Sequence, residues 1–156
     1  MNKKDLKPAS VFYYFEEICQ VPRPSKREEK IIAYLKAFGR KHGLETKTDE
    51  VGNVLIKNPA TPGKENLKTV ILQSHIDMVC EKNSDVEHDF LIDPIDTVVD
   101  GEWLKAKGTT LGADNGIGVA TELAILAATD IEHGPLECLF TVDEETGLTG
   151  AFALKP

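Results

Sequence analysis

Cysteine is scarce in this sequence, and the cysteines that are present form no recognisable pattern. Cys19, Cys80 and Cys138 are odd in number and widely spaced, and no C-x-x-C pair occurs. This argues against a disulfide framework and against a structural zinc site bound by thiolates. Cys19 and Cys138 lie in apolar runs, which predicts that both thiols are buried. A metal site in this chain would therefore use other ligands.

Long apolar runs and excess positive charge are also missing. No stretch of eighteen apolar residues occurs, and the segment 1–5 leads into no apolar signal region. The net charge is −8, so the chain lacks the basic face that binding to nucleic-acid phosphates requires. We therefore expect a cytoplasmic protein with no membrane and no nucleic-acid partner.

The composition is that of a soluble globular domain. The chain has 156 residues, of which 41% are apolar and 28% are charged, and this is enough for one buried core. The sequence contains no internal repeat, no low-complexity segment and no interdomain linker.

Apolar periodicity and turn residues predict an alternation of helices and strands. One helix is expected over residues 8–20, a second after the capping box formed by Ser25 and Glu28, and a third after Gly118. The expected strands are 44–49, 51–57, 70–72, 97–99, 103–106 and 136–142. This order predicts an α/β fold with a mixed, largely parallel sheet flanked by helices.

The strand that begins at Val70 ends at two polar residues, His75 and Asp77. Its continuous apolar block predicts a strand buried on both faces, and ligands bind at the carboxyl edge of such sheets. In such a pair the imidazole can bind a metal while the carboxylate accepts the other ring N–H. A surface histidine beside a strand-ending aspartate is the alternative, and these residues alone favour it.

Two further segments end in acidic groups beside glycine. Asp114 lies in a glycine-rich turn that lets the backbone approach a ligand closely, and Glu144 and Glu145 follow the last apolar strand. With His75, these carboxylates form a donor set suited to zinc, manganese or cobalt(II). Asp114 is the candidate to bridge two ions. Because neighbouring strand residues point to opposite faces, we expect one glutamate to bind metal and the other to act as general base.

Two other interpretations compete with a metal site. Gly116 and Gly118 supply the first two glycines of a dinucleotide-binding loop, but the third position is Thr121, and Asp114 would repel a pyrophosphate. Residues 143–145 alone are also typical of a solvated acidic turn. The presence of the other two clusters argues against that interpretation.

Three motifs resemble those of the dinuclear zinc dipeptidases, a family that includes glutamate carboxypeptidase and acetylornithine deacetylase relatives. They are SHIDMV at 74–79, LGADNGIG at 111–118 and TVDEETG at 141–147. The run HIDMVCEKN at 75–83 is most similar to the branch of bacterial aminoacyl-histidine dipeptidases. The resemblance implies a zinc-exopeptidase-like catalytic domain.

The resemblance also implies a role for each candidate residue. His75 would bind the first metal and Asp77 would orient it, Asp114 would bridge both ions, Glu145 would bind the second, and Glu144 would be the general base. The implied cofactors are two divalent ions, zinc or alternatively cobalt or manganese. A cis peptide bond after Asp114 is implied as well.

The implied activity is metal-dependent hydrolysis of dipeptides of the Xaa-His type, with a small peptide as substrate and a homodimer of the longer enzyme as its assembly. Family members are several hundred residues long. We therefore expect residues 1–156 to be the amino-terminal part of the catalytic domain, without the lid domain and the carboxyl-terminal part, and to be inactive alone. The alternatives are a non-catalytic metal- or peptide-binding module on the same scaffold and an amidohydrolase acting on N-acyl amino acids.

Overall fold

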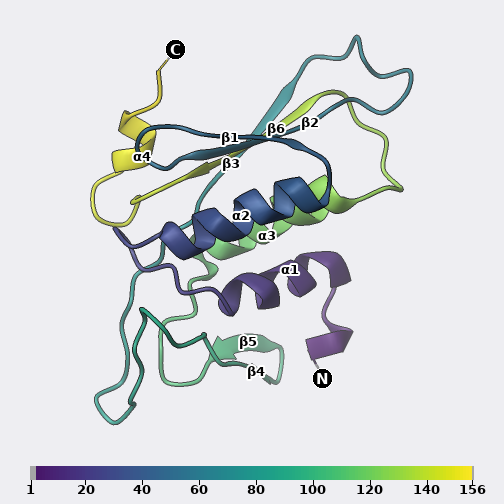
Figure 1. Ribbon diagram of the computed structural model, residues 1–156. Helices are drawn as coiled ribbons and strands as arrows, with labels where there is room; N and C mark the ends of the chain where they lie inside the picture. The colour runs from purple at the N-terminus through teal and green to yellow at the C-terminus, as the bar shows by residue number, and fades with distance from the viewer. Residues whose placement is uncertain (1–2, 156) are drawn as a thin grey trace.

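The computed structural model describes residues 3–155, which form a sheet with helices packed against it (Figure 1). The helical elements are the short 3-10 turn η1 (Lys3–Asp5), α1 (Ala9–Cys19), α2 (Glu29–Lys41), α3 (Ala113–Ala127) and α4 (Thr149–Phe152). The strands are β1 (Glu45–Thr48), β2 (Val54–Asn58), β3 (Val70–His75), β4 (Thr97–Asp100), β5 (Trp103–Ala106) and β6 (Leu136–Thr141). Among the described residues, no helix combines the length and apolar character needed to cross a bilayer.

The main sheet is mixed, as expected, but it is not largely parallel, because only one of its three strand pairings is parallel. Its strand order brings two strand ends together. The order is β1-β2-β6-β3, in which β1–β2 and β2–β6 are antiparallel and β3–β6 is parallel. In the parallel pair His75 lies opposite Thr141, so the carboxyl ends of β3 and β6 reach the same edge of the sheet. Residues that follow these two strands are therefore neighbours in space.

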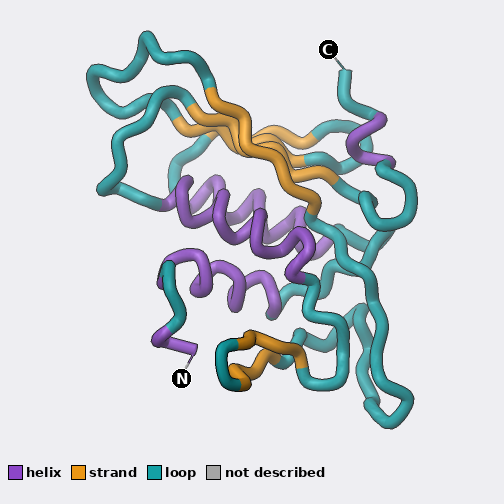
Figure 2. The backbone as a smooth tube through the Cα atoms, turned by 180° about the vertical axis from the view of Figure 1, so that it is seen from behind, coloured by secondary structure: helices purple, strands orange, loops and turns teal. Residues whose placement is uncertain are grey.

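Helices α1, α2 and α3 all lie on one side of the sheet (Figures 1 and 2). Helix α2 contacts β1 and β2, α3 contacts β3, and α1 packs on α3 as a further layer. The buried apolar side chains come from all these elements, and Cys19 and Cys138 lie among them as expected. Large members of this core are Phe15, Ile18, Ile31, Leu35, Ile56, Leu123 and Phe140. The expected α/β class is confirmed.

Strand β3 differs from its prediction. We expected it to be buried on both faces, but Val70 is 50% exposed and Ile71 is 62% exposed. The reason is that β3 is the last strand of the sheet and α3 covers only one of its faces. Burial is complete only at its carboxyl end, where Ser74 and His75 lie.

The prediction of a capping box formed by Ser25 and Glu28 was wrong. Helix α2 begins at Glu29, and no side chain caps its amino terminus. The hydroxyl of Ser25 instead donates to Asp77 Oδ2 over 2.7 Å. Glu28 Oε1 accepts the backbone N–H groups of Lys26 and Asp143, each over 3.0 Å. Partners distant in sequence therefore take both side chains that the local pattern assigned to the helix.

Candidate metal centre

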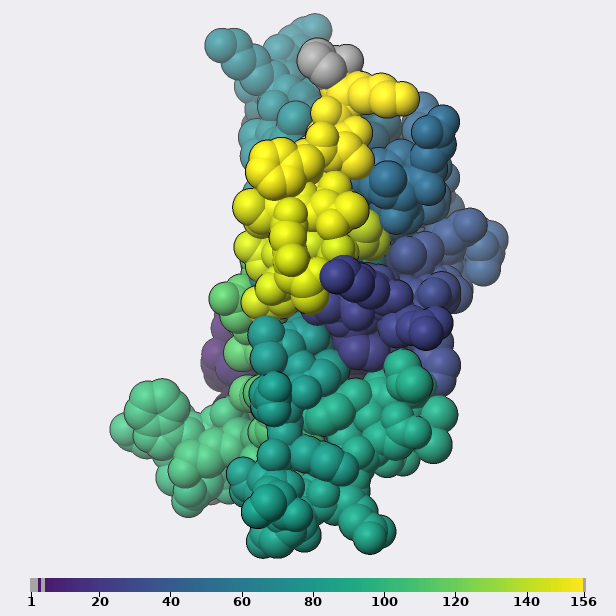
Figure 3. Space-filling view, turned by 90° about the vertical axis from the view of Figure 1, so that its left-hand side faces the viewer, coloured from purple at the N-terminus to yellow at the C-terminus, as the bar shows by residue number. Residues whose placement is uncertain are grey.

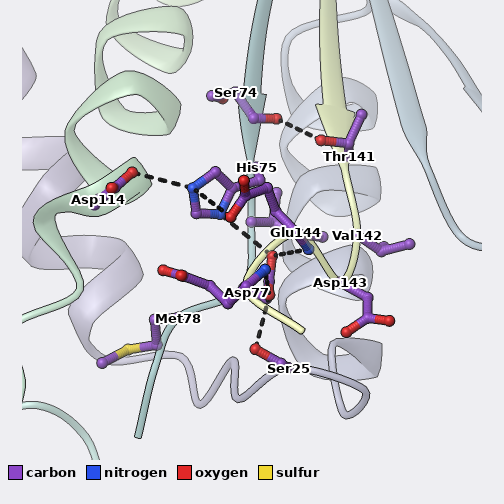
Figure 4. Close-up of polar contacts among 12 residues, drawn as sticks. Ser25, Ser74, His75, Asp77, Met78, Asp114, Thr141, Val142, Asp143 and Glu144 are labelled. Atoms are coloured by element: carbon purple, nitrogen blue, oxygen red, sulfur yellow. Dashed lines mark hydrogen bonds and ion pairs between the residues drawn. The ribbon is translucent and has the colours of Figure 1, made fainter. Parts of the chain in front are cut away.

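The site lies where the ends of β3 and β6 meet the start of α3 (Figure 4). His75 is the last residue of β3, Glu144 and Glu145 follow β6, and Asp114 lies at the start of α3. Figure 3 shows this face of the molecule, with the segment after β6 in yellow above the segment after β3 in teal. The structure thus brings together side chains from three segments that are far apart in the sequence.

The imidazole of His75 is the centre of this arrangement, and carboxylates lie at both of its nitrogens. Its Nδ1 lies 3.3 Å from Asp77 Oδ1, and its Nε2 lies 3.1 Å from Asp114 Oδ1 and 3.8 Å from Glu144 Oε2. Burial lowers the pKa of His75, but the hydrogen bonds to Asp77 and Asp114 outweigh it and raise the pKa to about 9. At neutral pH the ring therefore carries a proton on each nitrogen, and a cation at Nε2 would compete with one of them.

Asp77 is fully buried, and protein donors use both of its oxygens. Oδ1 accepts the N–H of Glu144 over 3.0 Å beside the ring of His75, and Oδ2 accepts the N–H of Glu145 over 3.2 Å and the Ser25 hydroxyl over 2.7 Å. Burial raises the pKa of Asp77, but these donors lower it to about 2. Asp77 is therefore ionised at neutral pH and is placed to orient the imidazole rather than to bind a cation itself.

Asp114 extends from the turn that starts α3. The peptide bond between Asp114 and Asn115 is cis, as the resemblance implies, and both residues have non-helical φ and ψ angles. The side chain of Asp114 is 88% exposed and reaches the outer nitrogen of His75. This side chain is thus free to share its oxygens with a ligand.

Glu144 and Glu145 both face His75. One ligand atom from each of these three residues lies within 4.8 Å of the other two. We expected the glutamates to point in opposite directions, but β6 ends at Thr141 and Asp143 has a φ of +48°, so the strand alternation is lost before residue 144. Burial raises the pKa of Glu145, His75 opposes this, and the charge of Glu144 raises it further. A cation between these groups would offset that accumulated negative charge.

A second acidic group lies directly behind the first. Oxygens of Glu28, Asp77 and Asp143 lie within 4.8 Å of one another, and all three residues are buried. The two oxygens of Asp143 accept the hydroxyls of Thr146 and Thr149, each over 2.5 Å. Because protein donors bind the oxygens of all three residues, this group holds the loop after β6 in place and does not need a cation.

Sequence patterns gave no sign of the residues behind the site. The local pattern predicted that Ser25 and Glu28 start a helix. It placed Arg23 only in the proline-rich segment that ends the preceding helix. Their partners lie at sequence separations of 52, 115 and 53 residues, respectively. No local pattern reports contacts of that range.

The donor set fits a divalent cation. An imidazole nitrogen and the carboxylates of Asp114, Glu144 and Glu145 are hard or borderline ligands of the kind that zinc, manganese and cobalt(II) accept. The inner ring nitrogen is held by Asp77, which is the arrangement usual for a metal-binding histidine.

Comparison with known proteins finds peptidases among the relatives of this chain. The chain is 51% identical over 150 residues to the cytosol non-specific dipeptidase of Escherichia coli strain K12, covering 96% of this chain and 31% of that protein. The crystal structure of aminoacylhistidine dipeptidase from Vibrio alginolyticus matches with a TM-score of 0.96 and 54% identity, covering 99% of this chain and 32% of that one. A tripeptidase from Staphylococcus aureus matches with a TM-score of 0.77 and 27% identity, covering 99% and 40%. The chain thus spans about a third of the length of its dipeptidase relatives.

Residues 71–155, more than half of the chain, match the family described as Peptidase family M20/M25/M40. This stretch includes every candidate metal-site residue, from His75 to Glu145. The chain therefore belongs to peptidase family M20/M25/M40.

Proposed function

We propose that this chain supplies the metal-binding residues of a dipeptidase, and that the complete catalytic unit is longer than residues 1–156. The observation that carries the proposal is the convergence of His75, Glu144 and Glu145 within 4.8 Å, with Asp77 holding the inner nitrogen of the ring. Two relatives that are more than half identical to the chain are named as dipeptidases. Because the chain spans about a third of each, dipeptide hydrolysis is proposed for the whole polypeptide.

We assign the ligand roles that the family resemblance implies, and the positions of the side chains are compatible with them. His75 would hold one ion and Glu145 a second, and Asp114, whose exposed carboxylate reaches His75 Nε2, would be a ligand to both. Zinc is the preferred ion, with cobalt and manganese as alternatives. Two divalent ions bound there would polarise the scissile carbonyl and lower the pKa of a water molecule.

Glu144 is the general base in this proposal. Its Oε2 lies 3.8 Å from His75 Nε2, and its side chain is 36% exposed, so water can reach it. The carboxylate takes a proton from the attacking water and passes it to the leaving amine. Meanwhile Asp77 keeps the His75 ring in one orientation. The substrate class is dipeptides, and a histidine in the second position agrees with the name of the Vibrio relative.

The test measures zinc content and hydrolysis of Xaa-His dipeptides by the full-length polypeptide and two variants. Glu144→Gln is expected to retain the metal and to lose about 10²- to 10⁴-fold in kcat, because the base is removed and the ligands are not. Glu145→Gln is expected to lose metal. Turnover that survives Glu144→Gln contradicts the assigned base, and wild-type protein without bound metal contradicts the centre. N-acyl amino acids in the same assay test the amidohydrolase alternative.

A further inference from the structure

Arg23 lies in the connector between α1 and α2 (residues 20–28), outside the stretch that matches the family. Its side chain is 2% exposed. Nη1 donates to the backbone carbonyls of Ile76 and Asp77, each over 3.3 Å, and Nη2 donates to the carbonyl of Gly112 over 2.7 Å. One guanidinium is therefore hydrogen bonded both to the loop after β3 and to the turn before α3.

The backbone of the connector strengthens one side of this link. The N–H of Met78 donates to the carbonyl of Arg23 over 3.1 Å, and Pro24 pairs with Met78 in a parallel bridge. In Figure 3 the connector, in dark blue, lies against both the yellow segment after β6 and the teal segment after β3. The loop that carries Asp77 is thus fixed to the connector by both backbone and side chain.

Two glycines make room for the guanidinium: Gly112, which directly precedes α3, and Gly116, near the start of that helix. A Cβ atom on Gly112 would lie 2.6 Å from Arg23 Nη2, and one on Gly116 would lie 2.7 Å from the same atom. Both distances are too short for a Cβ, so a side chain at either position would push the guanidinium away from the carbonyl of Gly112. The glycines that flank Asp114 therefore have a structural partner, which is the side chain of Arg23.

No carboxylate among the described residues lies within ion-pair distance of this guanidinium. Its acceptors are carbonyl oxygens of two separate loops, so the buried charge is stabilised only where those loops are correctly placed. The planar fork of an arginine can reach acceptors on both sides at once, whereas a lysine offers a single point of donation.

We propose that Arg23 is a positioning residue of the metal centre. By joining the carbonyls of Ile76 and Gly112, it sets the separation between the loop that follows His75 and the turn that carries Asp114. The separation of these two segments in turn affects the distance between His75 Nε2 and Asp114 Oδ1, which is 3.1 Å. The inference rests on the proposed function, because the ion that His75 and Asp114 would share is what requires this distance to be fixed. Arg23 itself touches neither the ions nor the substrate.

The first experiment measures amide hydrogen exchange on the full-length polypeptide in the presence of a chelator. Arg23→Lys keeps the charge and removes the fork, and the control Arg27→Lys makes the same change at an exposed position of the connector. Arg23→Lys is expected to speed exchange about ten-fold or more in both 76–78 and 112–116, and Arg27→Lys in neither. Faster exchange in only one of the two segments, or in none, overturns the link.

The second experiment titrates the full-length polypeptide with Zn²⁺ by calorimetry. Arg23→Lys and Arg23→Met are expected to weaken binding about 10- to 100-fold. Ile56→Val, a mild change in the core, reports the effect of lost stability alone and is expected to leave affinity unchanged. Wild-type Zn²⁺ affinity in Arg23→Lys overturns the positioning role. If Arg23→Met does not fold, the affinity of Arg23→Lys alone decides whether Arg23 has this role. If wild-type protein binds no Zn²⁺, the proposed function fails, whereas the exchange experiment still decides whether Arg23 joins the two loops.

Discussion

The hydroxyl of Ser25 donates a 2.7 Å hydrogen bond to Asp77 Oδ2 across 52 positions of sequence. Asp77 also accepts the N–H groups of Glu144 and Glu145 and holds the ring of His75. One buried carboxylate therefore connects the connector before α2, the end of β3 and the loop after β6. Residues behind the proposed metal centre thus fix the positions of the candidate ligands.

Replacing Ser25 tests the outer part of this network. Ser25→Ala removes one donor to an ionised, buried carboxylate, so we expect the pKa of Asp77 to rise and the free energy of unfolding to fall by about 2 kcal/mol. Urea unfolding at pH 7 measures the loss. Ser10→Ala, an exposed position in α1, is the control and is expected to change little. Equal effects of the two substitutions would contradict the assigned hydrogen bond.

Asp77→Asn tests how far the carboxylate controls the imidazole. The amide has one acceptor oxygen, so it cannot accept from both backbone N–H groups and hold His75 Nδ1–H as well. We expect Zn²⁺ affinity to fall about 10- to 100-fold, measured by calorimetric titration. Asp85→Asn removes a carboxylate at an exposed position and is the matched control. Unchanged affinity in Asp77→Asn would show that the imidazole is oriented without this residue.

Local sequence patterns predicted much of the fold and the membership of the site. Helix α1, the β4–β5 hairpin and the motifs that meet at His75 follow from periodicity, turn residues and the resemblance. The side on which Glu145 lies could not be predicted, because Asp143 leaves the strand conformation before it. The roles of Ser25 and Glu28 could not be predicted either, because tertiary partners replaced the local cap. Exposure of β3 depends on the strand order, which periodicity does not specify.

Glu122 makes the stability of the fold depend on pH. It is buried against β3 and β6, and Oε2 has no hydrogen-bond partner among the described residues. Burial raises the pKa of Glu122 to about 7, although Ser74 and Cys138 oppose the shift. In the unfolded chain a glutamate side chain has a pKa of about 4.3. The pKa of Glu122 is higher in the folded state than in the unfolded state. Its contribution to the free energy of unfolding is therefore complete below the unfolded pKa and is lost as pH rises through about 7.

Glu122→Gln removes this titration and is tested by urea unfolding between about pH 4 and pH 8. We expect the free energy of unfolding of the wild type to fall by about 3 kcal/mol relative to the variant over this range. The exposed Glu102→Gln is expected to follow the wild type at every pH. A constant difference between wild type and Glu122→Gln would mean that this carboxyl does not titrate in the range.

Gly112 separates backbone strain from crowding around Arg23. Its φ is +66°, and a Cβ there would lie 2.6 Å from Arg23 Nη2 and 2.7 Å from the sulfur of Met78. Gly43 has nearly the same φ, +67°, with no atom within 4 Å of its Cβ position. Gly43→Ala therefore measures the left-handed conformation alone, which costs about 1–2 kcal/mol.

Gly112→Ala is expected to cost more than Gly43→Ala in urea unfolding, because it adds steric crowding to the same backbone strain. It is also expected to weaken Zn²⁺ binding, since the guanidinium must move away from the Gly112 carbonyl that it binds over 2.7 Å. Gly43→Ala is expected to leave Zn²⁺ affinity unchanged. If the two alanine variants lose the same stability and bind Zn²⁺ equally well, the turn before α3 tolerates a displaced Arg23, and the close packing of this side chain against Gly112 does not determine the geometry of the site.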